Sequence, residues 1–482
     1  MNNNGKAECF RELRDNVIGI DTIVPTLDGS MKRYVFLDNA ASTPTFGRIV
    51  KCLEDFLPWY SGVHRGTGVK SLIATRVFDE THEIIGKFVG ADLKNNVVIL
   101  GKNTTEAINK LSARLNLTKY DIVISTLMEH HSDDLPWRKH AKVVHIGIAD
   151  DGRLFLNDLH EAIKKFSRKL KIVAVSGASN VTGVCNPVHT IARWAHEAGA
   201  KIFVDAAQLA PHVPIDIKSD DDPEHIDFIA FSAHKMYAPF GTGVLIGPRS
   251  VFELGEPDMV GGGVVELVTL DRVKWNEPPH KEEAGSPNVP GAVALAKAIL
   301  MLQEIGMNAI AEHERILLEY AFEKLRKVPG IRIYGPVDDL SDKVGVMSFN
   351  VLGMHNSLAA AIFGMEGAIG LRNGCFCAHP YLKQLLNCPA GQDTILLDQI
   401  SAGDRSQLPG MLRASLGCYN NEEDVDIFIE MLYRIVRKEY RGTYVQEKSS
   451  GAFYPVDFHF DPAKFFSLRG SSVPKNGEYS LY

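Results

Sequence analysis

One lysine gives the clearest chemical signal in this sequence. Lys235 lies in the stretch DFIAFSAHKMYAPFGTGVL, where an apolar run ends in a turn and a glycine-rich segment leads into another apolar run. A lysine held at the end of a buried strand, beside Ser232 and His234, loses hydration and becomes neutral enough to attack an aldehyde. Taken alone, the residue is better explained as a solvated surface lysine.

An aspartate earlier in the chain favours the reactive interpretation of Lys235 over the surface one. Asp205 ends the run KIFVD, and ligands of open α/β sheets collect where strands end. An enzyme that uses pyridoxal phosphate needs a carboxylate there, because the acid keeps the pyridine nitrogen protonated and makes the ring an electron sink. Gln208 follows and could bond the ring hydroxyl. Asp205 alone could cap a helix, but together with Lys235 it predicts a pyridoxal phosphate site.

A third motif is suited to the phosphate of such a cofactor. The run VVILGKNTTEAINKL places Thr104 and Thr105 after a strand and at the start of a helix, and a helix N-terminus with two hydroxyls attracts anions. A plain helix cap explains the same residues equally well. The sequence has no Walker A motif and no GxGxxG after a strand, which argues against a nucleotide.

His130, in STLMEHHSDDLPW, follows another strand and could stack on a pyridine ring and relay protons. Zinc binding by His130, His131 and Asp133 is the rival interpretation. No later cysteine or histidine cluster has metal spacing, so we expect no metal site.

Two cysteines complete the set of reactive groups. Cys375 and Cys377 lie in GLRNGCFCAHPYL, close to Arg372, and a positive neighbour lowers a thiol pKa and makes it nucleophilic. Without a cofactor nearby, inert core cysteines would explain them slightly better. The C-x-C spacing argues against both a redox pair and a zinc site.

The elements that must position these residues alternate through the middle of the chain. We predict strands at 96–100, 121–125, 142–148, 171–177, 201–207, 227–233 and 243–247, and helices at 105–115, 157–166 and 189–199. This alternation predicts a mostly parallel sheet covered by helices on both faces. Two helices, 291–306 and 308–328, lead into an α+β module. Residues 387–410 are expected to form a long loop, and the tail beyond Tyr440 has no clear element.

Bulk composition limits the class of protein. The chain has 482 residues, which suggests two unequal domains, and its 45% hydrophobic and 23% charged residues are typical of a soluble globular protein. A net charge of −7 offers no general attraction to nucleic acid or membranes. No apolar run reaches the length of a membrane span, and the N-terminus lacks a signal peptide. The seven scattered cysteines indicate a reducing, cytoplasmic compartment.

Together these residues resemble the class V aminotransferase branch of pyridoxal-phosphate enzymes of fold type I, and within it the cysteine desulfurase and selenocysteine lyase group. The stretches that match run from about Tyr34 to about Arg437 and are FLDNAASTP, VHRGTGVKS, GKNTTEAIN, MEHHSDDLPW, SNVTGVCNPV, VDAAQLAPH, FSAHKMYAPFGTGVL, EAGSPNVPGA, RNGCFCAHP and RASLGCYN. FSAHK, placed after VDAAQ, is highly specific for the branch.

The resemblance implies a role for each site residue. Lys235 would form the Schiff base, Asp205 would contact the pyridine nitrogen, and Gln208 the ring oxygen. His130 would stack on the ring and take part in catalysis. The phosphate would be held by Thr105, Ser232 and His234, and Ser286 of EAGSPN would reach the phosphate of the partner subunit of a homodimer. Asn180 would face the ring and substrate, and Arg413 would clamp the substrate carboxylate. Arg372 and Cys377 match the arginine and the nucleophilic cysteine of the desulfurase motif R-x-G-x-x-C.

The chain departs from the cysteine desulfurase pattern in three places. Cys375 and Phe376 stand where desulfurases of this type usually have His-His, and R-x-G-C-F-C is similar to molybdenum cofactor sulfurases. An extra loop lies between Cys377 and Arg413. The tail past Tyr440 has no counterpart.

We therefore expect a large mostly parallel α/β domain at 34–305, a smaller C-terminal α+β domain at 306–445, an N-terminal segment at 1–33 packed on the small domain, and a tail at 446–482. The expected reaction is removal of sulfur from L-cysteine to give L-alanine and a persulfide on Cys377, which would pass to a sulfur-acceptor protein. The alternatives are transamination, epimerisation or C–S lysis of another amino acid, sulfur transfer to a molybdenum cofactor, and a scaffold protein without turnover.

Overall fold

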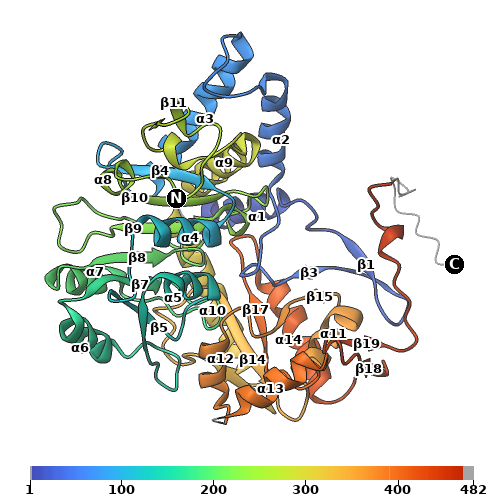
Figure 1. Ribbon diagram of the computed structural model, residues 1–482. Coiled ribbons are helices and arrows are strands. Elements are labelled where there is room, and N and C mark those ends of the chain that lie inside the picture. Colours follow the sequence, from blue (N-terminus) through green and yellow to red (C-terminus); the bar gives the residue numbers. More distant parts are fainter. Residues whose placement is uncertain (1–2, 390, 470–482) are drawn as a thin grey trace.

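The computed structural model describes residues 3–389 and 391–469 and is built around a seven-stranded sheet, shown in Figure 1. The strand order is β4-β10-β9-β8-β7-β5-β6, and every neighbouring pair is parallel except the two that involve β10. The strands are β4 (Asn96–Gly101), β5 (Ile122–Thr126), β6 (Lys142–Ile146), β7 (Leu170–Ser176), β8 (Lys201–Asp205), β9 (Phe228–Ser232) and β10 (Gly243–Pro248). The expected mostly parallel sheet is confirmed.

Helices cover both faces of this sheet, because successive side chains of a buried strand point to opposite faces. In β8, Ile202 and Val204 join one apolar cluster and Phe203 joins the other. The first cluster includes residues of α2 (Gly47–Phe56), α3 (Val69–Phe88), α6 (Leu156–Phe166), α7 (Val188–Glu197) and α9 (Val289–Ile305). The second includes residues of α4 (Thr104–Arg114), α5 (Leu135–His140) and α8 (Arg249–Glu253).

The smaller domain has its own sheet and core. Its four antiparallel strands run in the order β13-β14-β17-β16 and are β13 (Ile331–Tyr334), β14 (Val346–Val351), β17 (Met411–Ser415) and β16 (Arg372–Gly374). Its separate core takes apolar side chains from α10 (Met307–Leu325), α11 (Asn356–Gly367) and α14 (Glu422–Val436). α12 (His379–Leu386) follows the cysteine pair. A second module of mixed α and β structure is therefore present.

The N-terminal segment contacts both parts of the molecule. In α1 (Asn3–Asp15), Arg14 forms an ion pair of 2.7 Å with Asp424 of α14, whereas Leu13 belongs to the core of the large domain. The short strands that follow are β1 (Ile23–Pro25), β2 (Met31–Arg33) and β3 (Val35–Phe36), and β3 pairs with β15 (Ile369–Gly370). The domain boundaries given above stay a prediction.

Two expectations about loops were wrong. Residues 387–410 are not one long loop, because α13 (Gln392–Ser401) occupies their centre. Only Leu396 of this helix is buried, so its apolar residues do not show the one-sided pattern of a core helix. The tail beyond Tyr440 is also structured: β18 (Tyr444–Gln446) and β19 (Phe453–Pro455) form an antiparallel hairpin, and the 3₁₀ helix Pro462–Lys464 follows. Residues 470–482 of the predicted tail lie outside the described residues.

Another antiparallel pair, β11 (Val265–Val268) and β12 (Val273–Trp275), projects from the large domain ahead of α9. Within residues 3–389 and 391–469, no single helix has the length and apolar character of a membrane span. Only α9 and α10 taken together meet those two criteria, and they meet at a bend of 75°.

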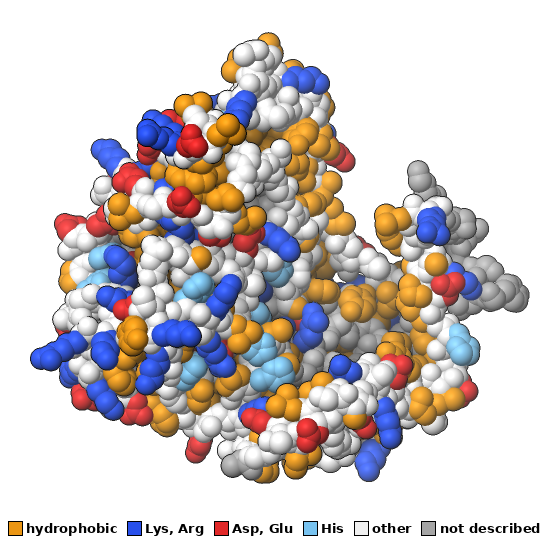
Figure 2. All heavy atoms as spheres, in the orientation of Figure 1, with side chains coloured by type: hydrophobic (Ala, Val, Ile, Leu, Met, Phe, Trp, Pro, Cys, Tyr) orange, Lys and Arg blue, Asp and Glu red, His pale blue; other side chains and the backbone are white. Residues whose placement is uncertain are grey.

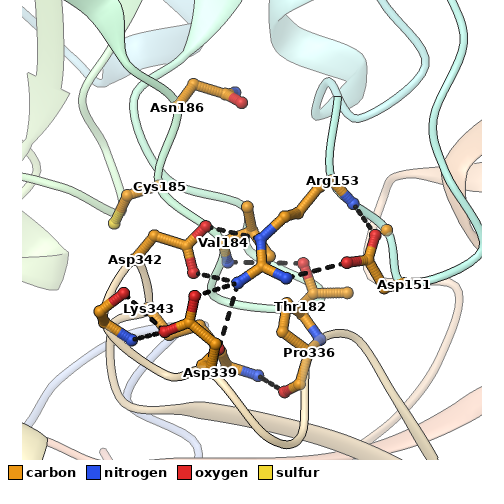
Figure 3. Close-up of polar contacts among 12 residues, drawn as sticks. Asp151, Arg153, Thr182, Val184, Cys185, Asn186, Pro336, Asp339, Asp342 and Lys343 are labelled. Carbon is orange, nitrogen blue, oxygen red and sulfur yellow. Dashed lines mark hydrogen bonds and ion pairs between the residues drawn. The ribbon is translucent and has the colours of Figure 1, made fainter. Parts of the chain in front are cut away.

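A polar junction joins the two domains, and Figure 3 shows its side chains converging on one arginine. Arg153, from the large domain, donates from Nε and Nη2 to the two oxygens of Asp342 at 2.8 Å each, and its Nη1 donates to Asp151 at 2.8 Å. Beside it, the buried Lys343 ammonium donates a 3.3 Å hydrogen bond to the carbonyl of Pro336 and lies 4.7 Å from the centre of the Phe322 ring. Burial lowers the pKa of Lys343 to about 7.

The buried Lys343 predicts a pH dependence of stability. Between about pH 7 and the usual lysine pKa of 10.5, the unfolded chain binds the proton that the folded chain has lost, so stability rises with pH by up to about 1.4 kcal/mol per unit. Lys343→Met should raise the thermal midpoint most near pH 7 and progressively less towards pH 10. Unfolding midpoints of both proteins across that range measure the effect, and Lys218→Met, at a partly exposed ion pair, serves as the control. If the difference in unfolding midpoint between Lys343→Met and wild type does not change with pH, the lowered pKa of Lys343 is contradicted.

Candidate active site

A cavity of about 910 Å³ lies at the carboxyl ends of β7, β8 and β9, against the small domain. Ser176, Asp205 and Ser232, the last residues of these three strands, all line it. Figure 2 shows histidine side chains gathered near the middle of the face that it presents to the viewer. The residues predicted from the sequence that line this cavity are Thr104, Thr105, His130, Asn180, Asp205, Gln208, Ser232, His234, Lys235, Arg372, Cys375, Cys377 and Arg413.

One end of the cavity is built around the N-terminus of α4. The side chain of Asn103 caps the helix by accepting from the Glu106 amide at 3.0 Å. The Thr104 and Ser232 hydroxyls lie 2.6 Å apart, so the helix start and the end of β9 are joined. The absence of a side chain at Gly243 of β10 allows this approach, because a Cβ there would lie 2.3 Å from Asn103 Cα. A helix start with hydroxyls beside it is a kind of structure that suits an anion.

Lys235 and Asp205 face the same cavity from the ends of adjacent strands. Lys235 ends the 3₁₀ helix Ala233–Lys235 that follows β9, and among the described residues its Nζ has no hydrogen-bond partner. Burial lowers the pKa of Lys235 to about 8, an effect that Asp205 opposes and Arg413 reinforces. Asp205 is buried and accepts from the amide of Ala207 at 2.9 Å. The lysine is thus available as a neutral amine near physiological pH.

Two further buried carboxyl groups stand behind Asp205. Glu129 accepts from the hydroxyls of Thr126 and Ser176 at 2.6 Å each, and Asp133 accepts from the Trp137 indole at 2.8 Å. Burial raises the pKa of Glu129 to about 7 and that of Asp133 well above its usual range. Burial also raises the pKa of Asp205. Burial thus disfavours the charged form of each of these carboxyl groups, and a positive charge next to Asp205 would stabilise its carboxylate.

His130 and Gln208 offer further polar groups to the cavity. The Nδ1 of His130 accepts from the Ser132 amide at 3.1 Å, and burial lowers the pKa of His130 to about 3, so the ring is neutral. Gln208 donates from Nε2 to the carbonyl of Ala40 at 3.0 Å. Its buried Oε1 has no partner among the described residues, so it is available to a ligand.

An arginine network lies on the small-domain side. Arg413, buried in β17, donates to the carbonyl of Asn180 at 2.9 Å and to Asp38 at 3.1 Å, whereas its Nε has no partner in the described part of the chain. The other oxygen of Asp38 pairs with Arg372 at 2.8 Å. Asp38 thus orients both arginines, which leaves a buried guanidinium donor available for an anionic ligand.

Cys377 sits on a strained turn beside this network. Phe376 and Cys377 have φ angles of 52° and 55°, a left-handed conformation that costs energy in residues other than glycine. Asn180 donates to the Phe376 carbonyl at 2.7 Å, and the His131 amide donates to the Cys377 carbonyl at 2.7 Å. The Arg413 guanidinium lies 4.7 Å from the centre of the Phe376 ring. These contacts hold the turn so that the Cys377 side chain is exposed, whereas Cys375 is half-buried and burial raises its pKa.

Ser286 is the one predicted site residue that the structure does not bring to this cavity. It lines a separate cavity of about 830 Å³ that His64, Arg65 and His280 also line. Its contact with a partner subunit stays a prediction.

Some residues of the site were missed in the sequence. Asp38 and Glu129 lie in the matching stretches FLDNAASTP and MEHHSDDLPW, but their types alone do not distinguish them from capping or surface acids. His379, whose Nδ1 lies 3.0 Å from His131 Nε2, is brought to the cavity by the packing of α12. No spacing rule could have paired these residues, because they come from distant segments.

Comparisons with known proteins agree with this geometry. The Aminotransferase class-V family matches residues 35–428. A probable cysteine desulfurase of Halalkalibacterium halodurans is 34% identical over 438 residues, covering 89% of this chain and 99% of that protein. The cysteine desulfurase of Haloferax volcanii is 34% identical over 407 residues, or 83% and 88% of the two chains. The apo cysteine desulfurase of Thermococcus onnurineus NA1 superposes with a TM-score of 0.73 at 33% identity, covering 84% of this chain and 95% of that one.

Proposed function

Since this chain belongs to the class V aminotransferase family, we propose that it is a pyridoxal-phosphate-dependent cysteine desulfurase, which converts L-cysteine to L-alanine and leaves the sulfur as a persulfide on Cys377. The observation that carries the proposal is the exposed Cys377, held on its turn at the same cavity as Lys235, Asp205 and Arg413. This reaction needs four groups: an amine, an acid for a ring nitrogen, a cation that binds the substrate carboxylate, and a thiol.

The residues present fit pyridoxal phosphate. The buried Asp205 suits a protonated pyridine nitrogen, and the unpartnered Oε1 of Gln208 is free for the ring hydroxyl. The start of α4, with Thr104, Thr105, Ser232 and His234 around it, suits the phosphate. His130 lines the cavity and would stack on the ring. When bound, the cofactor supplies an electron sink for the bonds at the substrate α-carbon.

The side chains of this chain would carry out the remaining steps. Arg413 binds the substrate carboxylate through its free Nε, assisted by Asn180 and Arg372. Lys235 takes the proton from the α-carbon, because a pKa of about 8 leaves part of it neutral near pH 7. The Cys377 thiolate attacks the substrate sulfur, and the Cβ–S bond breaks with its electron pair remaining on carbon. That carbon takes up a proton, and Lys235 returns the proton to the α-carbon, which completes alanine.

The direct test is product analysis with purified enzyme and pyridoxal phosphate. L-Cysteine should yield equal amounts of alanine and of sulfide, the latter released by an added reductant, whereas an α-keto acid should not form. Production of pyruvate or of a D-amino acid in place of alanine would reject the desulfurase proposal and favour C–S lysis or epimerisation.

Arg413 provides a second test of substrate binding. Arg413→Lys should raise KM for L-cysteine by about 100-fold, because an ammonium group cannot keep the contacts with Asn180 and Asp38 and also donate to the substrate carboxylate. Steady-state kinetics measure the change, and Arg405→Lys, at the outer edge of the cavity, is the matched control. An unchanged KM for L-cysteine would remove Arg413 from the substrate site.

We further propose a homodimer in the cytoplasm. Support comes from the separate cavity around Ser286, which would face the phosphate of the partner subunit, and from seven cysteines that all remain free.

A further inference from the structure

The part of the active-site cavity that lies beside α13 is here called the outer chamber. This outer chamber is lined by the apolar side chains of Leu396, Leu397, Ile400, Leu408 and Pro409. Its first three residues come from α13, which Figure 1 shows in the small domain beside α12. The cofactor and the substrate positions described above use none of these residues.

Hydrogen bonds hold the walls of the outer chamber together. The Arg405 amide and guanidinium donate to the carbonyls of Lys448 and Ser449 at 2.8 Å each, and the Gln446 side chain donates to the Ser406 carbonyl at 3.1 Å. The segment after α13 is thereby fixed to the β18–β19 hairpin, whose turn residues Ser450 and Gly451 also line the cavity. These hydrogen bonds hold the lining of the outer chamber in place, so it is not a loose surface loop.

The chemistry of the outer chamber favours an apolar occupant. Of the charged groups at its edge, Lys383 and Asp393 form an ion pair and the Arg405 guanidinium donates to the Ser449 carbonyl. Burial lowers the pKa values of His355 and His379, so both rings are neutral at physiological pH. Leu397 lines the cavity with 63% of its side chain exposed, which leaves apolar surface for a ligand to cover.

We propose that the outer chamber binds the sulfur acceptor, and that this acceptor is a low-molecular-weight thiol with an apolar group. This inference rests on the proposed function. The acceptor thiolate attacks the outer sulfur of the Cys377 persulfide, and the S–S bond of the enzyme breaks. The Cys377 sulfur leaves as a thiolate that takes up a proton, and the acceptor becomes the persulfide R–S–SH.

The shape of the chamber favours a small molecule over a protein acceptor. α13, the 405–409 segment, the hairpin turn and the N-terminus of α11 wall it on several sides. The whole cavity is about 910 Å³ and in the proposed function also holds the cofactor and the substrate, so the outer chamber has room only for a small molecule. Cys377 opens into the same cavity, so a molecule seated against Leu397 and Ile400 shares its space with the reactive sulfur.

The test uses the holoenzyme loaded with one sulfur from isotopically labelled L-cysteine. Loss of the Cys377 persulfide is then timed on mixing with 2-mercaptoethanol, 1-propanethiol, 1-butanethiol and 1-pentanethiol. The second-order rate constant should rise by up to about fourfold for each added methylene, which is the factor that full burial of one methylene supplies. Once each rate constant is divided by the fraction of that thiol present as thiolate, 2-mercaptoethanol should be the slowest of the four.

Two matched variants test whether the rise in rate constant per methylene depends on the outer chamber. Leu397→Gln should reduce the rise per methylene, because it replaces apolar wall by an amide. Ile395→Gln should leave the rise at its wild-type value, because Ile395 is similarly exposed, at 60%, on the same helix but does not line the cavity. A loaded enzyme that reacts equally fast with all four thiols, or variants that behave alike, would overturn the chamber proposal. An enzyme that makes no persulfide from cysteine would instead refute the proposed function itself.

Discussion

Lys235→Ala is expected to abolish turnover of L-cysteine, with a loss of at least about 10⁴-fold. Proton transfer by a placed side chain alone contributes about 10²–10⁴-fold, and the variant also loses the covalent attachment of the cofactor. The wild-type protein should be yellow, and the variant should lack the visible band of the lysine-bound cofactor. Alanine production and the visible spectrum measure the two effects independently.

Lys235→Arg distinguishes the loss of the reactive amine from the loss of the positive charge near Asp205. Arginine keeps a cation near Asp205, which otherwise lies buried with other carboxyl groups, but it stays protonated and cannot act as a base. Both variants should therefore be inactive, whereas their thermal midpoints without cofactor should differ because only alanine removes the counter-charge. Near-normal alanine production by either variant would mean that Lys235 is not the cofactor lysine.

Cys377→Ser should eliminate persulfide formation while cysteine binding persists. A hydroxyl cannot attack the substrate sulfur, whereas Lys235, Asp205 and Arg413 remain in place to bind substrate. Addition of L-cysteine should still change the visible spectrum of the bound cofactor, yet neither alanine nor sulfide should accumulate. Stopped-flow absorbance with product analysis distinguishes binding from turnover.

Cys375→Ser is the matched control for this variant. Cys375 is half-buried and burial raises its pKa, so at neutral pH it is mainly the protonated, unreactive thiol. Its loss should slow the reaction at most severalfold. Mass spectrometry of wild-type enzyme mixed with cysteine should locate the extra sulfur on the peptide with Cys377. If Cys377→Ser converts cysteine or another amino acid as fast as wild type, sulfur transfer through this residue is refuted.

Local patterns in the sequence were sufficient for the large domain. Its strands are short β-branched runs buried on both faces and its helices are amphipathic, so each element carries its own signal. Asp205 and Lys235 each follow such a strand. Because parallel strands end at one edge of a sheet, the placement of both groups at one cavity was predictable.

The small domain and the outer part of the cavity were less predictable. Its strands are short, and the run IGLRN divides between two of them, β15 and β16. α13 has one buried residue, so no apolar face distinguished it from a loop, and the β18–β19 hairpin becomes recognisable only from its partners in the 402–409 segment. A regular spacing of apolar residues arises where a segment packs against a core. These segments face a cavity and solvent, so they lack that spacing.

The sequence by itself determined the fold class and was sufficient to predict the cofactor type and the reactive lysine and cysteine, because those signals lie within single strands and the turns after them. Only the tertiary structure decided how the groups act together. Asp38 joins Arg372 to Arg413, Asn180 and His131 fix the strained turn of Cys377, and α13 closes the far wall. These contacts join residues far apart in the chain, and their free energies depend on distances and burial that no local pattern encodes.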